Sequence, residues 1–167
     1  MVTIVLPSDV PDEGESVSIL ECLDAGGRSP FSRWFAELNA AAAARVTIAL
    51  YRLEQGNKEY SKKMALTKEF RETVYRRAQR DAAFRKALLT EAVNAYLGGD
   101  EVTGKAVLRD VINATIGFEK LAAAVHKPSK SLHRMLGPRG NPNTTNFFTI
   151  LQVLQEKVGV TLRVRAA

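Results

Sequence analysis

The chain has 167 residues, of which 46% are hydrophobic and 25% are charged, a composition that is typical of a folded globular protein and excludes wholesale disorder. No run of about eighteen apolar residues occurs, which argues against a membrane-spanning helix, and the first residues lack the basic start of a secretory signal. The single cysteine, Cys22, excludes an internal disulfide, so we expect a cytoplasmic protein in a reducing compartment.

The net charge of +6 is unevenly distributed along the chain. Residues 1–57 contain four arginines and eight acidic residues, a net charge of −4, whereas residues 58–167 contain 20 Lys/Arg and 10 acidic residues, a net charge of +10. A basic segment of about a hundred residues indicates a polyanionic partner such as nucleic acid, although charge by itself does not identify that partner.

The first predicted elements are two short strands, residues 2–6 and 17–23, which read VTIVL and VSILECL. They flank an acidic loop rich in Pro, Gly and Ser. The pattern predicts a hairpin with a long connection, in which Cys22 is a small apolar strand residue.

Two helices are predicted next. Ser29 is suited to cap the first helix, and Pro30 fits the first helical position, where proline is favoured. The apolar face of this helix consists of Phe31, Trp34, Phe35 and Leu38. Asn39 is suited to cap the second helix, which ends at Gly56. Helical spacing predicts that this second helix buries Val46, Ala49, Leu50 and Leu53.

A polar stretch without apolar periodicity, residues 58–66, is interpreted as a linker between an N-terminal segment, residues 1–57, and a second domain, residues 67–167. This second domain is expected to begin with three helices, capped by Thr67, Asp81 and Asp100. The periodicity predicts that their main buried residues are Phe70, Val74, Ala78, Phe84, Leu88, Leu89, Ala92, Val93, Tyr96, Val107, Leu108, Val111 and Ile112.

Three further helices are predicted near residues 118–126, near residues 129–136, and after a cap at Asn143. The chain then ends in an alternating pattern that predicts a strand over residues 160–165. The predicted fold class is therefore mainly α: a helical domain, a small N-terminal strand–helix–helix segment and a C-terminal strand.

The stretch over residues 127–142, KPSKSLHRMLGPRGNP, carries the functional signal. Pro128 breaks the chain between two short helices, and Leu132 with Met135 or Leu136 is expected to face inward. We therefore expect a helix–turn–helix over about residues 118–136. The alternative is two packed helices with a basic exterior. The candidate DNA-binding residues are Lys127, Ser129, Lys130, Ser131, His133, Arg134, Arg139 and Asn141.

These candidates differ in the role expected of them. His133 and Arg134 are suited to base edges, because an arginine can bind guanine through two hydrogen bonds. Cations at Lys127, Lys130 and Arg139 are better placed for phosphates. Ser129 is expected to cap its helix rather than to read a base.

The longer stretch LAAAVHKPSKSLHRMLGPRGNPNTTNFFTIL resembles the helix–turn–helix of phage-repressor-type bacterial regulators. The matching positions are Leu121-Ala122, Leu132, Arg134-Met135, Asn141-Pro142, Phe147 and Ile150. The sequence departs from that pattern at His126, where those proteins usually have Gly, and at Lys127, where they usually have an aliphatic residue. These departures from the family pattern predict a modified interhelical turn and a phosphate contact at Lys127.

Residues 64–167 as a whole resemble the short antidote proteins (HigA-like) of bacterial toxin–antitoxin addiction modules. The segments that carry this resemblance are MALTKEFRETV, FRKALLTEA, VLRDVINATIGFEKLA and KPSKSLHRMLGPRGNP. The resemblance implies a protein that neutralises a partner toxin and represses its own operon, usually as a dimer.

Residues 20–57 resemble the first half of a RelE-like (HigB-type) killer protein. In that family the mRNA-cleaving residues lie mainly on later strands, which have no counterpart here because the polar linker follows directly. We therefore expect no enzymatic activity, in particular no ribonuclease activity. The apolar faces of this truncated segment, including Trp34, Leu38 and Leu50, are expected to pack on the antidote-like helices or on the strands; the alternative is a loosely attached appendage.

No other chemistry is indicated. The two histidines, His126 and His133, have no cysteine or acidic cluster beside them in sequence, so no metal or cofactor is expected. The resulting hypothesis is an autorepressor of the antitoxin type that binds operator DNA as a homodimer and is associated with the nucleoid when bound. The alternative is a protein-interaction antidote that binds a RelE-like toxin without strong DNA binding.

Overall fold

The computed structural model of the chain describes residues 2–5, 18–21, 23–24, 26–56 and 68–163. The predicted linker, the acidic loop, Cys22, Thr67 and the last four residues lie outside the described residues. Within the described ranges the protein is mainly helical, as the sequence predicts, and no helix there is long and apolar enough to cross a bilayer.

Two strands come first, β1 (Val2–Val5) and β2 (Ser18–Glu21). They pair antiparallel, with Val2 opposite Glu21 and Val5 opposite Ser18. The helices that follow in the described ranges are α1 (Pro30–Glu37), α2 (Ala40–Gly56), α3 (Lys68–Arg80), α4 (Ala82–Leu97), α5 (Glu101–Thr115), α6 (Phe118–Ala124), α7 (Ser129–Met135) and α8 (Thr144–Val158).

The helix starts are set by local side-chain caps, because a free oxygen accepts from an otherwise unpaired amide in the first turn. Ser29, Asn39 and Asp81 accept from Ser32, Ala42 and Phe84, respectively. The caps predicted at Asp100 and Asn143 are confirmed in the same way. At α7 the prediction is wrong: Pro128, with an extended backbone, is the N-cap and Ser129 is the first helical residue, with no side-chain cap.

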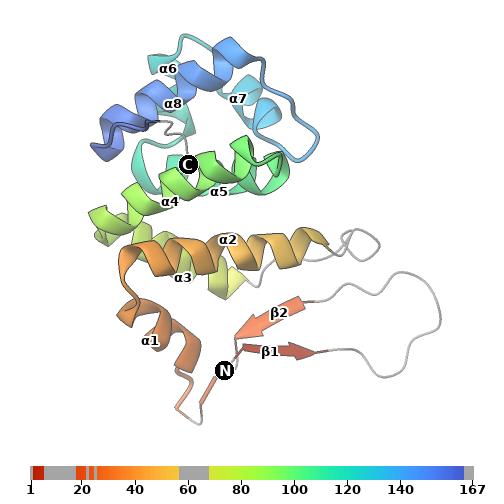
Figure 1. Cartoon of the computed structure of the whole chain (residues 1–167), viewed down its shortest axis with the longest axis vertical. Coiled ribbons are helices and arrows are strands. Elements are labelled where there is room, and N and C mark those ends of the chain that lie inside the picture. Colours follow the sequence, from red (N-terminus) through yellow and green to blue (C-terminus); the bar gives the residue numbers. More distant parts are fainter. Residues whose placement is uncertain (1, 6–17, 22, 25, 57–67, 164–167) are drawn as a thin grey trace, which may run out of the picture.

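The helices form an elongated arrangement (Figure 1). The helices α6, α7 and α8 gather at one end, whereas α1 and the β1–β2 pair lie at the other. Between them, α2 packs against α4 and α5, and α3 packs against α1, α4 and α5. One hydrophobic core contains residues from both sides of the predicted linker, so α1 and α2 are integral to the fold and not a loosely attached appendage.

Four phenylalanines join α1 to the helices beyond the linker. Phe31 and Phe35 of α1 contact Phe70 of α3 with ring centroids 5.4 and 6.1 Å apart, and Phe35 meets Phe84 of α4 edge-on at 5.8 Å. Such offset and edge-on arrangements are the favourable ones for aromatic pairs. Trp34, which was expected to be buried, is 47% exposed, with its ring centroid 5.5 Å from that of Phe31.

The buried face of α2 also differs from the prediction. Instead of Ala49 and Leu53, which are exposed, the residues that α2 buries are Ala43, Ala44, Thr47, Ile48 and Tyr51. The two alanines allow close approach to neighbouring helices. The polar groups are satisfied inside the core: the Thr47 hydroxyl donates to the Ala43 carbonyl at 2.9 Å, and the Tyr51 hydroxyl donates to Asp110 of α5. The predicted Val46 and Leu50 are half-buried.

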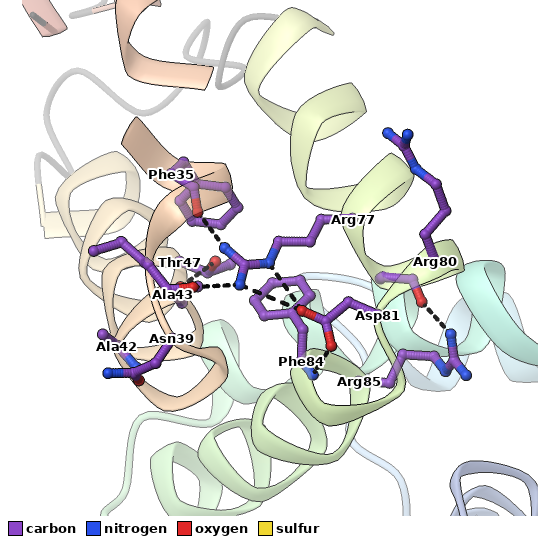
Figure 2. A network of polar contacts seen from close by, with 12 residues as sticks. Phe35, Asn39, Ala42, Ala43, Thr47, Arg77, Arg80, Asp81, Phe84 and Arg85 are labelled. Atoms are coloured by element: carbon purple, nitrogen blue, oxygen red, sulfur yellow. Dashed lines mark hydrogen bonds and ion pairs between the residues drawn. The ribbon is translucent and has the colours of Figure 1, made fainter. Parts of the chain in front are cut away.

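Arg77 of α3 fastens α1 to the rest of the fold (Figure 2). Its guanidinium donates to the carbonyl oxygens of Phe35 and, at 2.6 Å, Leu38, and to the Asp81 carboxylate at 3.3 Å. Its Cζ also lies over the Phe35 and Phe84 rings, at 5.2 and 4.9 Å from their centroids. One partly buried cation thus caps the C-terminus of α1, which is a favourable place for positive charge.

The described part of the predicted C-terminal strand, residues 160–163, is not in a strand. After α8 the chain folds back on that helix instead, because the amides of Val160 and Leu162 donate to the backbone and side-chain oxygens of Gln155. The alternating pattern is nevertheless explained, since Val160 and Leu162 pack against the core while Thr161 and Arg163 are exposed.

Candidate nucleic-acid interface

The connection between α6 and α7 is a tight, defined turn. The Lys127 amide donates to the Ala122 carbonyl at 3.0 Å and the His126 amide to the Ala123 carbonyl at 3.3 Å, the hydrogen-bond pattern of a Schellman motif. His126 has φ of +52°, in the left-handed region where glycine is usually preferred. The turn therefore forms with histidine in the position where the resembling regulators have glycine, but the backbone of His126 is strained there.

The helix α7 has a buried apolar side and an exposed polar side. Leu132 and the following Leu136 are fully buried, and Met135 is half-buried. Lys130, His133 and Arg134 are exposed, whereas the remaining candidates on this helix and its turn, Lys127, Ser129 and Ser131, are partly exposed. The structure therefore brings six of the eight candidates together on one turn and one short helix.

His133 has a contact that the sequence did not indicate. Its ring stacks on that of Phe118 at the start of α6, with centroids 3.8 Å apart and planes 20° apart. Stacking covers one face of the imidazole and fixes its plane, and with it the direction in which the ring nitrogens can form hydrogen bonds. Arg134, one residue further along, has no such stacking contact within the described ranges.

The other two candidates, Arg139 and Asn141, lie in the loop between α7 and α8. Both are exposed, but the loop is held against the end of α7: a Cβ at Gly140 would lie 2.1 Å from the Arg134 carbonyl oxygen and 2.2 Å from that of Met135. Only glycine fits such an approach. The loop therefore packs directly against the C-terminal end of α7.

A buried lysine of α5 forms a hydrogen bond to this loop. Lys105 of α5 is only 4% exposed, and its ammonium donates to the Gly140 carbonyl at 2.5 Å. Burying a cation is unfavourable unless it is hydrogen-bonded, so the contact fixes the loop to α5 as well as to α7. Sequence reasoning missed Lys105, because a lysine in an amphipathic helix normally faces solvent.

The charged side chains in the sequence around α7 are all positive. From Lys120 to Gln155 the sequence contains five Lys/Arg residues and no Asp or Glu. No carboxylate of the described residues forms an ion pair with Lys127, Lys130, Arg134 or Arg139. The exposed side of α7 and the adjoining loop therefore present positive charge without local neutralisation, which favours an anionic ligand.

Among the described residues no three His, Cys, Asp or Glu side chains lie close enough together to hold a metal ion.

Comparison of the chain with known protein families, with curated proteins and with solved structures finds no match.

Proposed function

We propose that the protein is a DNA-binding transcriptional regulator of the antitoxin type, with α6 and α7 acting as a helix–turn–helix. In this proposal α7 enters the major groove and α6 lies across the backbone, the docking used by this motif. The observation that carries the proposal is the exposed cationic side of α7, which lies in a 36-residue stretch without an acidic side chain and has a fully buried apolar side beneath it.

The roles of the side chains follow from their positions. Arg134, exposed and without a carboxylate partner in the described ranges, is proposed to bind a guanine through two hydrogen bonds. Lys127, Lys130 and Arg139 are proposed to bind phosphates on either side of it. His133 is proposed to contact a base edge through a ring nitrogen, with its ring held in place by stacking on Phe118.

The proposal includes a homodimer, because helix–turn–helix regulators bind two half-sites that are roughly 34–36 Å apart. Exposed apolar side chains on α4, α5 and α8 support a protein contact of this kind. Leu97, Val102 and Phe148 are all exposed, and α8 contacts both α4 and α5. The same observation favours a second candidate function, the binding of a RelE-like toxin by an antidote.

A gel-shift titration tests the proposal with DNA from immediately upstream of the gene. We expect binding whose affinity falls steeply with salt, because several phosphates are neutralised. Replacing Lys130 by Gln reduces the salt dependence and weakens binding on all sequences equally. The matched control is Arg45→Gln on α2, an exposed position far from α7, which leaves binding unchanged. Co-purification with a full-length toxin and no DNA binding would favour the second candidate.

A further inference from the structure

A cleft of about 800 Å³ lies between α1, the loop before it and α3. The helix α1, which forms one wall of the cleft, lies at the opposite end of the molecule from α7 (Figure 1). The walls of the cleft carry the hydroxyl groups of Ser29, Ser32 and Thr73, and Phe35 and Asp81 also line it. Five of the thirteen described residues that line it are arginines: Arg28, Arg33, Arg76, Arg77 and Arg80.

The five arginines are not equivalent. Arg77 is committed to the fold through its bonds to α1 and Asp81. Arg28 and Arg76 lie 3.5 Å from Asp24 and Glu72, but both pairs are exposed, and exposed ion pairs exchange readily with other partners.

Arg33 and Arg80 have no ion pair with any carboxylate of the described residues. Arg33 lies on α1 and is exposed, and Arg80 lies at the end of α3, where its Nε donates to the Arg76 carbonyl at 3.2 Å. Figure 2 shows Arg80 extending away from the Arg77 network. Up to four guanidinium groups from both walls are thus available to a ligand.

The accumulation of these charges is unfavourable without an anion. Arg76 and Arg80 are four residues apart on one helix face, a spacing at which like charges destabilise a helix. Asp81, the one carboxylate among the described lining residues, already binds Arg77, and Arg28 and Arg76 are paired with Asp24 and Glu72, so the charges that lack a carboxylate are those of Arg33 and Arg80. An anionic ligand would relieve this repulsion, and guanidinium groups bind phosphate oxygens in pairs with favourable geometry.

We propose that this cleft binds a small polyphosphate, the class to which nucleoside triphosphates and inorganic tripolyphosphate belong. Its volume is within the usual range for a small-molecule site and exceeds what a single phosphate fills. Several guanidinium groups on two facing walls match several linked phosphates better than they match a single phosphate. A duplex bound to α7 at the other end of the molecule does not fill this cleft, so the site is separate from the DNA interface.

The ligand would bridge the two walls of the cleft. Arg33 belongs to α1 and Arg80 to α3, on opposite sides of the predicted linker, so phosphates that bind both arginines hold these helices together. Because such a ligand binds only the folded chain, it raises the unfolding temperature, and the rise continues with the logarithm of the ligand concentration once that concentration exceeds the Kd. Polyphosphate binding is therefore measurable as stabilisation as well as directly.

The test is isothermal titration calorimetry of the full chain with tripolyphosphate, ATP and AMP, together with thermal unfolding in each ligand. We expect tripolyphosphate and ATP to bind and stabilise, and AMP to bind much more weakly. The double variant Arg33→Gln/Arg80→Gln loses affinity by about tenfold or more. The control variant Arg45→Gln/Arg109→Gln removes the same charge outside the cleft and retains affinity.

The outcomes separate the possible sources of the phosphates. Tighter binding of ATP than of tripolyphosphate identifies a nucleotide, and equal binding identifies the polyphosphate chain as the recognised group. Equal losses in the two double variants, no binding by either triphosphate, or cleft-dependent binding of a short single-stranded RNA alone would overturn the proposal. If the cleft double variant unfolds without ligand, the single variant Arg33→Gln replaces it in the same comparison.

Discussion

Removal of the Arg77 guanidinium is expected to destabilise the protein more than removal of any neighbouring exposed arginine. The side chain is only 12% exposed, and the variant Arg77→Met leaves three acceptors without their donor: the carbonyl oxygens of Phe35 and Leu38 and the Asp81 carboxylate. An abandoned buried acceptor costs about 1–3 kcal/mol. Because Arg77 and Asp81 line the cleft and the Asp81 side chain is 33% exposed, water can reach part of this network, so the lower end applies.

The expected loss in the free energy of unfolding is therefore about 3 kcal/mol in total. Urea unfolding followed by circular dichroism measures it, with the exposed Arg80→Met on the same helix as the matched control. The control is expected to change stability by less than about 0.5 kcal/mol. A loss below about 1 kcal/mol for Arg77→Met, or equal losses in the two variants, would refute the argument that this residue fastens α1 to α3.

Three further predictions concern the turn, the loop and the dependence of stability on pH. His126→Gly removes the strain of a left-handed backbone and is expected to raise the free energy of unfolding by about 1 kcal/mol in a urea titration; no gain would contradict the strain. Gly140→Ala cannot be accommodated next to the end of α7, so DNA binding in a gel shift is expected to fall sharply while far-UV circular dichroism shows that the other helices remain. Partial burial acts to raise the pKa of Asp100, but hydrogen bonds from Arg52 and Thr103 together outweigh burial and lower the pKa. The ionised Asp100 carboxylate therefore stabilises the fold above about pH 4, and this stabilisation is lost as the pH falls. Arg52→Gln should reduce stability by at most about 1 kcal/mol at neutral pH and by less at pH 3, and an equal difference at both pH values would exclude this linkage.

The sequence predicted those features that depend on neighbouring residues. The caps at Ser29, Asn39 and Asp81 were predictable because each cap accepts from an amide three residues further along the chain. The buried positions of α3, such as Phe70 and Val74, followed equally well from a regular apolar spacing. Local chemistry was sufficient in these cases.

The features that depend on tertiary contacts were missed or misplaced. The buried face of α2 was wrong because Thr47 and Tyr51 look polar in sequence, and only their partners, the Ala43 carbonyl and Asp110, make them core residues. Lys105 was missed because its acceptor lies 35 residues away. The arginine-lined cleft was missed because its two walls lie on either side of the predicted linker.

Binding of operator and scrambled duplexes by the wild-type protein and by Arg134→Ala tests the proposed function most directly. Fluorescence anisotropy at one fixed salt concentration gives the four affinities. If α7 reads bases through Arg134, the wild-type protein prefers the operator, and the variant loses about 1–3 kcal/mol on the operator while binding the scrambled duplex almost as before. Equal affinity of the wild-type protein for both duplexes, or an Arg134→Ala variant that retains the full preference, would contradict the account.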